Sequence, residues 1–258
     1  VFEGVRAYET KRGPSIFRLH DHTDRLYKSA ATVNMEIPHS KELINKAHEN
    51  IIKVNDLKEA YIRPMCFYGS EGMGLRADNL KVHTMVAAWE WPSYMEPEAR
   101  EKGIKVKLSS YKRQVKNPVS NAKVNGNYVH SIVALNEALE NGFDEALMLD
   151  PYGFVNTTNS CNFFIVKNNE VWTSTGDYCM NGITRLKVIE LCKDNNISVF
   201  EKNFSLVDVY SSQEAFITGT LGSLTQVLSI DGRSIGDSNY GWPISEKLRE
   251  LYKNLLNV

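Results

Sequence analysis

The chain has 258 residues, of which 42% are hydrophobic and 24% charged, which is typical of a globular protein with its own core. Its 30 basic and 31 acidic residues give a net charge of −1, so it lacks the basic excess of nucleic-acid-binding proteins. Its four scattered cysteines do not form a disulfide framework or a CxxC metal motif, and no apolar run reaches the roughly 20 residues that span a bilayer. We therefore expect a cytoplasmic enzyme or small-ligand-binding protein without nucleic-acid, membrane or metal partners.

The first part of the chain predicts two helices followed by two strands. Apolar residues at helical spacing predict a helix over 22–33 and another after Ser40, which can cap it. Alternating and β-branched residues predict strands over 60–68 and 80–89. Two prolines and no regular period indicate a linker over 90–97.

The second part predicts hairpins interleaved with helices. A helix over 127–141 should end at Gly142, and Thr184 can cap a helix with Leu186, Ile189 and Cys192 inward. The remaining predicted elements are a hairpin of 145–149 and 154–155, a hairpin of 162–166 and 171–172 that turns at Asn168-Asn169, a strand over 214–218 and a helix over 244–256. This order favours an α+β protein over a doubly wound parallel sheet.

Three short segments stand out for chemistry. Lys123 precedes the turn Asn125-Gly126-Asn127, the segment 180–184 ends at a predicted helix start, and the segment 218–223 follows a strand. The last two can hold an anion on backbone N–H groups and hydroxyls. Each segment alone is more often a solvated lysine, a helix cap or a turn.

The order of several motifs is more specific than any one of them. The segments are VFEGVRAYET (1–10), FRLHDHTDRLYKS (17–29), AYIRPM (60–65), AKVNGNY (122–128), GITR (182–185) and FITGT (216–220). In this order they resemble the branched-chain aminotransferase family, the class IV aminotransferases of pyridoxal-phosphate fold type IV. The resemblance implies a small N-terminal α/β domain, which we expect over 1–95 with an upstream segment missing, and a larger C-terminal pseudo-barrel domain over 96–258.

The resemblance also implies residues that hold pyridoxal 5′-phosphate. Lys123 matches the lysine that forms a Schiff base with the cofactor, and the same amine would move the substrate's α-proton. Arg25 matches a phosphate ligand, because a guanidinium can bond two phosphate oxygens at once. Tyr128 matches the partner of the phenolic oxygen, and the remaining implied cofactor residues are Thr157 at the ring nitrogen and Ile183, Thr184 and Thr220 at the phosphate.

The substrate pocket implied by the resemblance combines apolar walls with one cation. Arg63 would be the cation, and without the resemblance it would still need a partner in its apolar strand. Phe2 and Tyr61 match pocket positions, although both also fit a plain strand core. The other implied substrate residues are Trp91, Tyr94, Leu75 and Leu221.

Several positions depart from the family pattern, namely Asn156, Thr157, Thr158, Cys161, Ser223 and Gln226, and Thr157 has the most direct chemical consequence. A glutamate that pairs with the protonated pyridine nitrogen is expected where Thr157 stands. A threonine hydroxyl has no charge and can donate a hydrogen bond to an unprotonated nitrogen, which would weaken the ring as an electron sink. The alternatives to transamination are therefore a lyase, eliminase or racemase of the same fold, or a cofactor-binding relative with little activity.

The function implied by the resemblance is transfer of an amino group between a branched-chain or other hydrophobic L-amino acid and a 2-oxo acid such as 2-oxoglutarate, as in branched-chain amino acid biosynthesis. The resemblance also implies a homodimer or higher homo-oligomer, in which a loop containing Leu75 completes the site of a neighbouring chain.

Overall fold

The structure is a computed structural model that describes residues 1–91, 102–113, 119, 121–237 and 241–256. These residues form two compact units. The first unit contains residues 1–91, 122–126 and 256, and the second contains the other described residues. Tyr94 and the predicted boundary between 95 and 96 lie outside the described residues, so that boundary stays a prediction.

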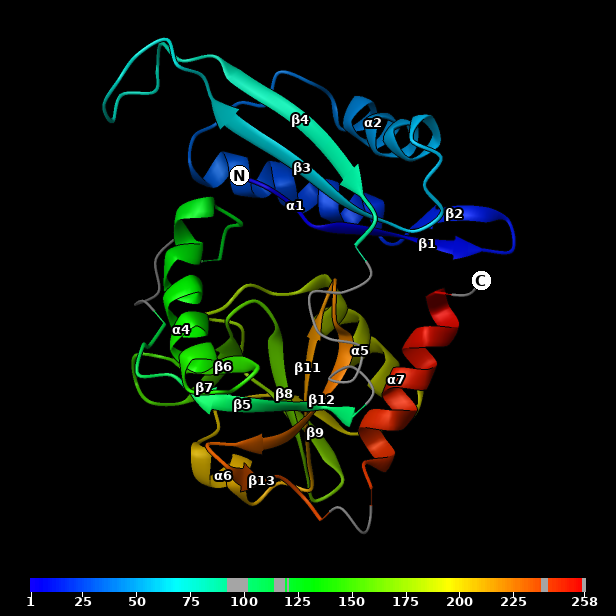
Figure 1. Cartoon of the computed structure of the whole chain (residues 1–258), viewed down its shortest axis with the longest axis vertical. Helices are drawn as coiled ribbons and strands as arrows, with labels where there is room; N and C mark the ends of the chain where they lie inside the picture. The colour runs from blue at the N-terminus through cyan, green and yellow to red at the C-terminus, as the bar shows by residue number, and fades with distance from the viewer. Residues whose placement is uncertain (92–101, 114–118, 120, 238–240, 257–258) are drawn as a thin grey trace. The chain divides into compact units, whose positions relative to one another are not determined.

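The first unit is an antiparallel sheet with two helices, as Figure 1 shows. The strand order is β2-β1-β3-β4, and residues such as Tyr61 and Trp89 lie opposite each other on β3 and β4. The elements are β1 (Val5–Thr10), β2 (Gly13–Ile16), α1 (Leu19–Thr32), α2 (Lys41–Val54), β3 (Ala60–Tyr68) and β4 (Val82–Trp89). The two predicted helices and two predicted strands are confirmed, and the Ser40 hydroxyl caps α2 by accepting a bond from the Leu43 N–H.

The helices of the first unit pack on one face of its sheet. Leu26 of α1, Ile44 of α2 and Cys66 of β3 are buried in one cluster, and Ile62 is buried in an adjoining one. Because side chains alternate along a strand, Tyr61 and Arg63 lie on the opposite face of β3. The same alternation that predicts the strand therefore separates a hydrophobic core from a polar and aromatic face.

The second unit contains a closed barrel among its described residues. The strands follow the order β8-β11-β12-β5-β6-β7, and a β7–β8 pairing through Thr157 and Asn162 closes the ring. The barrel strands are β5 (Ile104–Leu108), β6 (Glu145–Leu149), β7 (Val155–Thr158), β8 (Asn162–Lys167), β11 (Glu214–Gly219) and β12 (Ser223–Ile230). Strands β9 (Glu170–Thr173) and β10 (Val199–Glu201) extend this sheet beyond β8, and β13 (Arg233–Ser234) pairs with β12. The expected pseudo-barrel is thus present.

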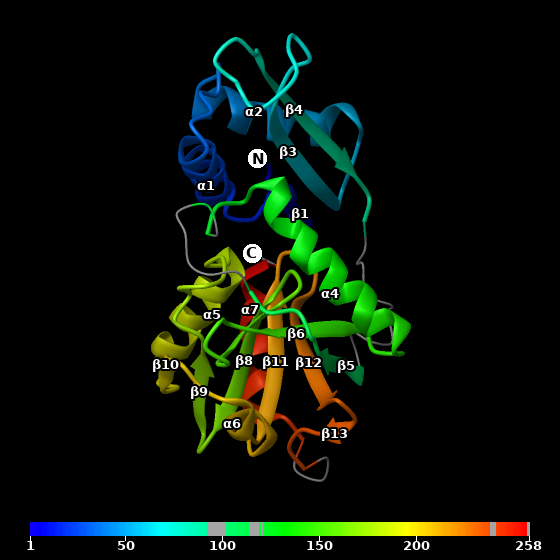
Figure 2. The same ribbon diagram turned by 90° about the vertical axis from the view of Figure 1, so that its left-hand side faces the viewer.

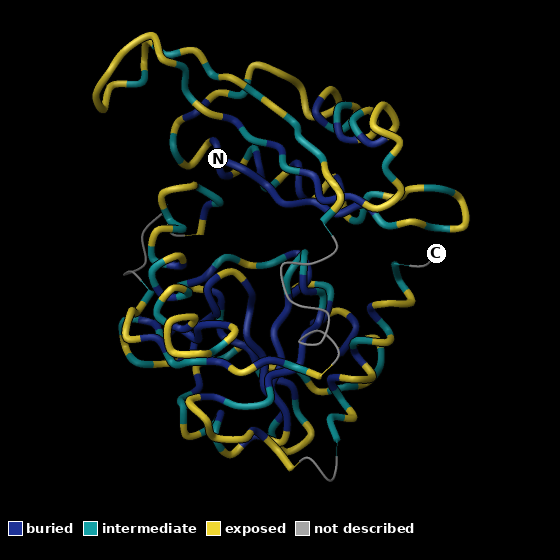
Figure 3. Tube along the Cα trace, viewed as in Figure 1, coloured by how far each residue is buried: buried dark blue, intermediate teal, exposed yellow. Residues whose placement is uncertain are grey.

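Among the described residues of the second unit, four helices lie around this barrel in two views (Figures 1 and 2). They are α4 (Val129–Glu140), α5 (Ile183–Asp194), α6 (Leu206–Tyr210) and α7 (Pro243–Leu256), and a 3₁₀ turn, η1 (Asn125–Tyr128), leads into α4. The barrel interior is apolar, with Phe163, Ile165 and Ile217 almost completely buried, and Figure 3 shows its strands in the colour of buried residues. No helix in the described ranges combines the length and apolar character needed to cross a membrane.

Turn chemistry explains the hairpins of the second unit. Asn168 and Asn169 have φ values of 54° and 61°, which asparagine tolerates and a tight hairpin requires. Gly142 follows α4 with φ 78°, so this predicted glycine position is confirmed, and Gly153 closes the β6–β7 turn with φ 94°.

The predicted start of α5 is wrong by two residues. Gly182, rather than Thr184, is the N-cap residue, and Thr184 lies inside the first turn. Leu186 is 48% exposed rather than inward, whereas Ile189 and Cys192 are buried as expected. The helix begins earlier because the segment before it is held by long-range contacts that local propensity does not contain.

Candidate active site

Lys123 is held at its backbone by two segments of the first unit. Its N–H donates to the Ser29 hydroxyl of α1 at 2.9 Å, and its carbonyl accepts from the Phe2 N–H at 3.2 Å. The Lys123 amine lies 4.8 Å from the centroid of the Phe2 ring. These contacts join residues far apart in the sequence and hold the base of the lysine side chain in one place.

A buried ion pair lies in the same unit. Glu3 is fully buried, and Arg25 donates to both of its carboxylate oxygens, from Nε at 2.7 Å and from Nη2 at 2.9 Å. The buried His22 ring forms a third hydrogen bond to this carboxylate at 2.8 Å. This forked arrangement fixes the plane of the Arg25 guanidinium.

The electrostatics of this group follow from its burial. Burial by itself raises the pKa of Glu3, but the charge and hydrogen bond of Arg25, the His22 hydrogen bond and the nearby Lys123 charge outweigh it and lower the pKa to about 2. Burial lowers the pKa of His22, against the opposing effect of its bond to Glu3. Glu3 is therefore ionised and His22 neutral at pH 7.

An aromatic cluster of Phe2, Tyr61, Trp89 and Trp91 is also part of the first unit. The Tyr61 ring lies 5.1 Å from each of the two tryptophan rings, measured between centroids. The Arg63 guanidinium lies 4.8 Å from the Phe2 centroid and donates to the Tyr61 hydroxyl from two nitrogens, at 3.1 and 2.6 Å. A Cβ at Gly4 would lie 2.4 Å from this hydroxyl, so the glycine leaves room for it.

The bond directions around Tyr61 set the role of its hydroxyl. Arg63 can only donate, so the Tyr61 oxygen accepts both bonds and acts toward any further group as a donor. The Phe2 ring beside Arg63 also contacts the Lys123 amine. The first unit thus gathers a primary amine, a guanidinium and a phenol donor around one aromatic ring.

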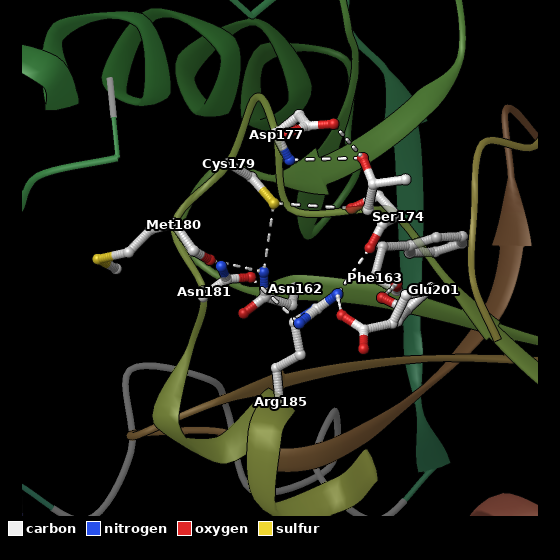
Figure 4. Close-up of polar contacts among 11 residues, drawn as sticks. Asn162, Phe163, Ser174, Asp177, Cys179, Met180, Asn181, Arg185 and Glu201 are labelled. Atoms are coloured by element: carbon white, nitrogen blue, oxygen red, sulfur yellow. Dashed lines mark hydrogen bonds and ion pairs between the residues drawn. The ribbon is translucent and has the colours of Figure 1, made fainter. Parts of the chain in front are cut away.

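In the second unit, the segment before α5 is fixed by two buried side chains, as Figure 4 shows. The fully buried Arg185 donates to the Ser174 carbonyl at 2.7 Å, to Asn181 Oδ1 at 3.1 Å and to Glu201 at 2.7 Å. Asn162 donates to the Met180 carbonyl at 3.0 Å. These bonds hold the chain that enters the helix.

The start of α5 is suited to an anion. Gly182 provides no side chain to cap the first-turn N–H groups, which include those of Ile183 and Thr184. Helix N-termini with uncapped N–H groups bind phosphate through these groups and the helix dipole. Thr220 and Leu221 lie in the three-residue turn between the paired residues Gly219 and Ser223 of β11 and β12.

Tyr128 and Thr157 are the other cofactor residues implied by the resemblance. Tyr128 is half-buried at the N-cap position of α4. Thr157 is buried in β7, and its hydroxyl donates to the Cys161 carbonyl oxygen at 2.7 Å. The single hydrogen of this hydroxyl is used in that bond, so the expected donation to a ring nitrogen would require the bond to Cys161 to be given up, and that expectation stays a prediction.

Two further substrate residues were predicted, Leu75 and Tyr94. Leu75 projects from the β3–β4 loop with an exposure of 105%, and Tyr94 lies outside the described residues. Three residues of the first-unit site were not predicted: Glu3, His22 and Trp89. The signal for Glu3 is a carboxylate within an apolar segment, which requires a cationic partner in the same way as Arg63.

The comparisons with known proteins agree with this fold. The family model of the class IV amino-transferases matches residues 1–230, and the chain belongs to this family. It is a transaminase, and the cofactor of its class is pyridoxal 5′-phosphate.

The similar proteins are named for a narrower activity than the class IV family. The branched-chain-amino-acid aminotransferase of Pseudomonas aeruginosa is 48% identical over 258 residues, which cover 100% of this chain and 84% of the relative. The crystal structure of the Escherichia coli branched-chain amino acid aminotransferase has a TM-score of 0.95 at 33% identity and covers 100% of this chain and 85% of its own. The branched-chain aminotransferase of Thermoproteus uzoniensis, solved with norvaline, has a TM-score of 0.92 at 32% identity, with coverage of 99% and 84%. These relatives give no support to a lyase or racemase.

Proposed function

We propose that this aminotransferase exchanges the amino group of a branched-chain or other hydrophobic L-amino acid with a 2-oxo acid such as 2-oxoglutarate. The names of the relatives support this substrate class. The observation that carries the proposal is the arrangement around Phe2, where the Lys123 amine and the Arg63 guanidinium each lie 4.8 Å from one ring centroid. An amine for the reaction and a cation for a carboxylate are thereby held at an apolar wall.

The residues present fit the proposed cofactor. Lys123 supplies the primary amine that the cofactor aldehyde requires, and the uncapped start of α5 supplies N–H donors for a phosphate. We propose that Arg25, Ile183, Thr184 and Thr220 bind the phosphate. Tyr128 and Thr157 are proposed to contact the ring. When bound, pyridoxal phosphate supplies a carbonyl carbon to which amines add and a ring that takes up an electron pair from the substrate's α-carbon.

Lys123 is the proposed catalytic residue. Its amine would take the proton from the substrate's α-carbon and would deliver it to the cofactor carbon that receives the amino group. This transfer requires a base that stays beside both carbon atoms. The bonds from Lys123 N–H to Ser29 and from Phe2 N–H to the Lys123 carbonyl support this role, because they keep the lysine backbone in one position.

The aromatic cluster is the proposed substrate pocket. Phe2, Tyr61 and Trp91 offer apolar surface to a branched side chain, and Tyr61 can donate to a carboxylate because its oxygen already accepts from Arg63. Arg63 would receive the second carboxylate of an acidic 2-oxo acid. Tyr94 and Leu221 are proposed to complete the substrate contacts.

We also propose that the protein is a cytoplasmic homodimer. Leu75 and Met73, with exposures of 105% and 101%, place two apolar side chains at the projecting β3–β4 loop. Fully exposed apolar side chains in a loop favour contact with a partner chain. By the family resemblance, Leu75 would complete the substrate site of the neighbouring chain.

The catalytic proposal is tested by trapping the lysine. Borohydride reduction of the holoenzyme followed by peptide mass spectrometry should find the cofactor on Lys123 in the segment 122–128. Lys123→Ala should lose this adduct and reduce turnover of leucine with 2-oxoglutarate by at least about 10³-fold. Lys112→Ala is the matched control and should behave as wild type. Turnover retained in Lys123→Ala, or an adduct on another lysine, would contradict the proposal.

A further inference from the structure

The hydroxyl of Thr157 has a defined direction. Strand β7 carries Thr157 opposite Met148 of β6 and opposite Asn162 of β8, at the point where the barrel closes. The Cys161 carbonyl oxygen accepts from Thr157 Oγ1 at 2.7 Å, from Thr158 N at 2.9 Å and from Thr158 Oγ1 at 3.1 Å. A carbonyl oxygen cannot donate, so the Thr157 hydroxyl must be the donor in its bond.

This direction limits what else Thr157 can do. A hydroxyl has one hydrogen and two lone pairs, and the hydrogen of Thr157 is used in the bond to Cys161. Toward a second group, Thr157 is therefore an acceptor only. A protonated ring nitrogen can donate a hydrogen bond to such an oxygen. An unprotonated nitrogen has only a lone pair, which would be repelled by the lone pair of the Thr157 oxygen.

We infer that Thr157 accepts a hydrogen bond from the ring nitrogen of the cofactor and thereby favours the protonated ring. The inference rests on the proposed function and on the proposed position of Thr157 at that nitrogen. The carboxylate expected from the family pattern also accepts from this nitrogen, so Thr157 preserves the direction of the hydrogen bond without its charge. The proton comes from solvent, and no other group changes its protonation.

This inference removes the reason for expecting a different reaction. A threonine that donates to the nitrogen would hold the ring neutral and weaken it as an electron sink. A threonine that accepts from the nitrogen keeps the ring cationic, which is the form that transamination uses best. Thr157 is in this sense a positioning and protonation-determining residue of the known reaction class.

The test measures the nitrogen itself. The holoenzyme is prepared with pyridoxal phosphate labelled with ¹⁵N in the ring, and the ¹⁵N resonance is followed against pH. We expect the wild-type resonance in the pyridinium range at pH 7.5. Thr157→Val should lower the pH at which the nitrogen loses its proton by about one to two pH units, since a hydrogen bond to a charged group is lost.

Two variants separate this effect from damage to the turn. Thr157→Ser keeps the hydroxyl and should keep the wild-type titration. Thr158→Val is the matched control, because its hydroxyl also donates to Cys161 but belongs to a residue with no proposed cofactor contact. It should lower thermal stability and leave the nitrogen titration unchanged.

The nitrogen titration can contradict the role of Thr157 without contradicting the proposed aminotransferase activity. A wild-type resonance in the neutral pyridine range would overturn the inference even if Thr157→Val does not fold. An unchanged titration in Thr157→Val, or an equal shift in Thr158→Val, would also overturn it. Borohydride labelling of Lys123 and leucine turnover are measured on the same preparations, so a failure of the aminotransferase proposal is recognised separately.

Discussion

Glu3 is a carboxylate that stays ionised in a fully buried position. It does so because Arg25 and His22 supply three hydrogen bonds and the Arg25 and Lys123 charges attract it, which together lower its pKa from 4.5 to about 2. A carboxyl group whose pKa is lower in the folded state stabilises the protein above its ordinary pKa. This stabilisation is lost as the pH falls from about 4.5 toward about 2.

We expect Glu3→Gln to reduce the free energy of unfolding by about 3 kcal/mol at pH 7, because it leaves the Arg25 charge without its buried partner. The difference from wild type should be constant above about pH 5 and should shrink at lower pH, as wild-type Glu3 becomes protonated. Urea denaturation at several pH values measures both effects.

Glu9→Gln provides the control for Glu3→Gln. Glu9 forms an exposed ion pair with Lys58 at 3.5 Å, and its loss should change the free energy of unfolding by less than about 0.5 kcal/mol. Equal effects of the two substitutions, or a pH-independent effect at Glu3, would show that the charge of Glu3 does not stabilise the fold.

At the scale of elements, the N-terminus of α5 depends on the close approach of Gly182 and Asn162. A Cβ at Gly182 would lie 2.3 Å from Asn162 Oδ1, and Asn162 is held in place by its bond to the Met180 carbonyl. Glycine is required at position 182 because there is no space for a side chain. Its backbone angle does not require glycine, since any residue can adopt a φ of −66°.

We expect Gly182→Ala to lower the free energy of unfolding by about 1–3 kcal/mol, because Asn162 must move and lose its hydrogen bond. Gly126→Ala is the control, because a Cβ at Gly126 meets nothing within 4 Å. The control should be neutral or stabilise the protein by up to about 1 kcal/mol. Thermal and urea unfolding measure both variants, and equal stability of the two would contradict the steric account.

The elements themselves were largely predictable from local chemistry. Alternation predicted β3 with its observed ends, Ser40 predicted the start of α2, and the Asn168-Asn169 pair predicted its hairpin. The start of α5 was not predictable in this way. Its position depends on Asn162 and Arg185, whose contacts with the preceding segment follow from the fold and not from helix propensity.

For the whole molecule, the motif order predicted the family and the barrel, and the family model and solved relatives confirm both. The motifs also predicted which residues contact the cofactor and the substrate, and these residue roles stay predictions. The distances could not be predicted, because Lys123 meets Ser29 and Phe2 only through chain reversals over about a hundred residues.

The proposed dimer gives a prediction for Leu75. Leu75→Ser should raise the KM for leucine several-fold in the dimer, because an apolar contact supplied by the partner chain is worth about 1–2 kcal/mol. It should leave the thermal midpoint unchanged, since Leu75 is fully exposed in the single chain. Steady-state kinetics measures the KM, thermal unfolding measures the midpoint, and sedimentation velocity shows whether the enzyme is dimeric.

Val54→Ser is the control for the loop. Val54 is an exposed apolar residue at the end of α2, with an exposure of 77%, and its change should affect neither KM nor assembly. A purely monomeric wild-type enzyme, or an equal KM for Leu75→Ser and wild type, would remove Leu75 from the proposed substrate site.

The sequence by itself determined the α+β class and most helices and strands, and it singled out Lys123 as the proposed catalytic residue. These follow from side-chain periodicity, turn residues and motif order, all of which are local or linear properties of the chain. Only the tertiary structure decided that β7 closes the barrel on β8, that Glu3 binds Arg25 and His22, and that the Thr157 hydroxyl points its hydrogen at Cys161. The physical reason is that a hydrogen bond has a direction and a partner, and both are set by which distant residues the fold brings within about 3 Å.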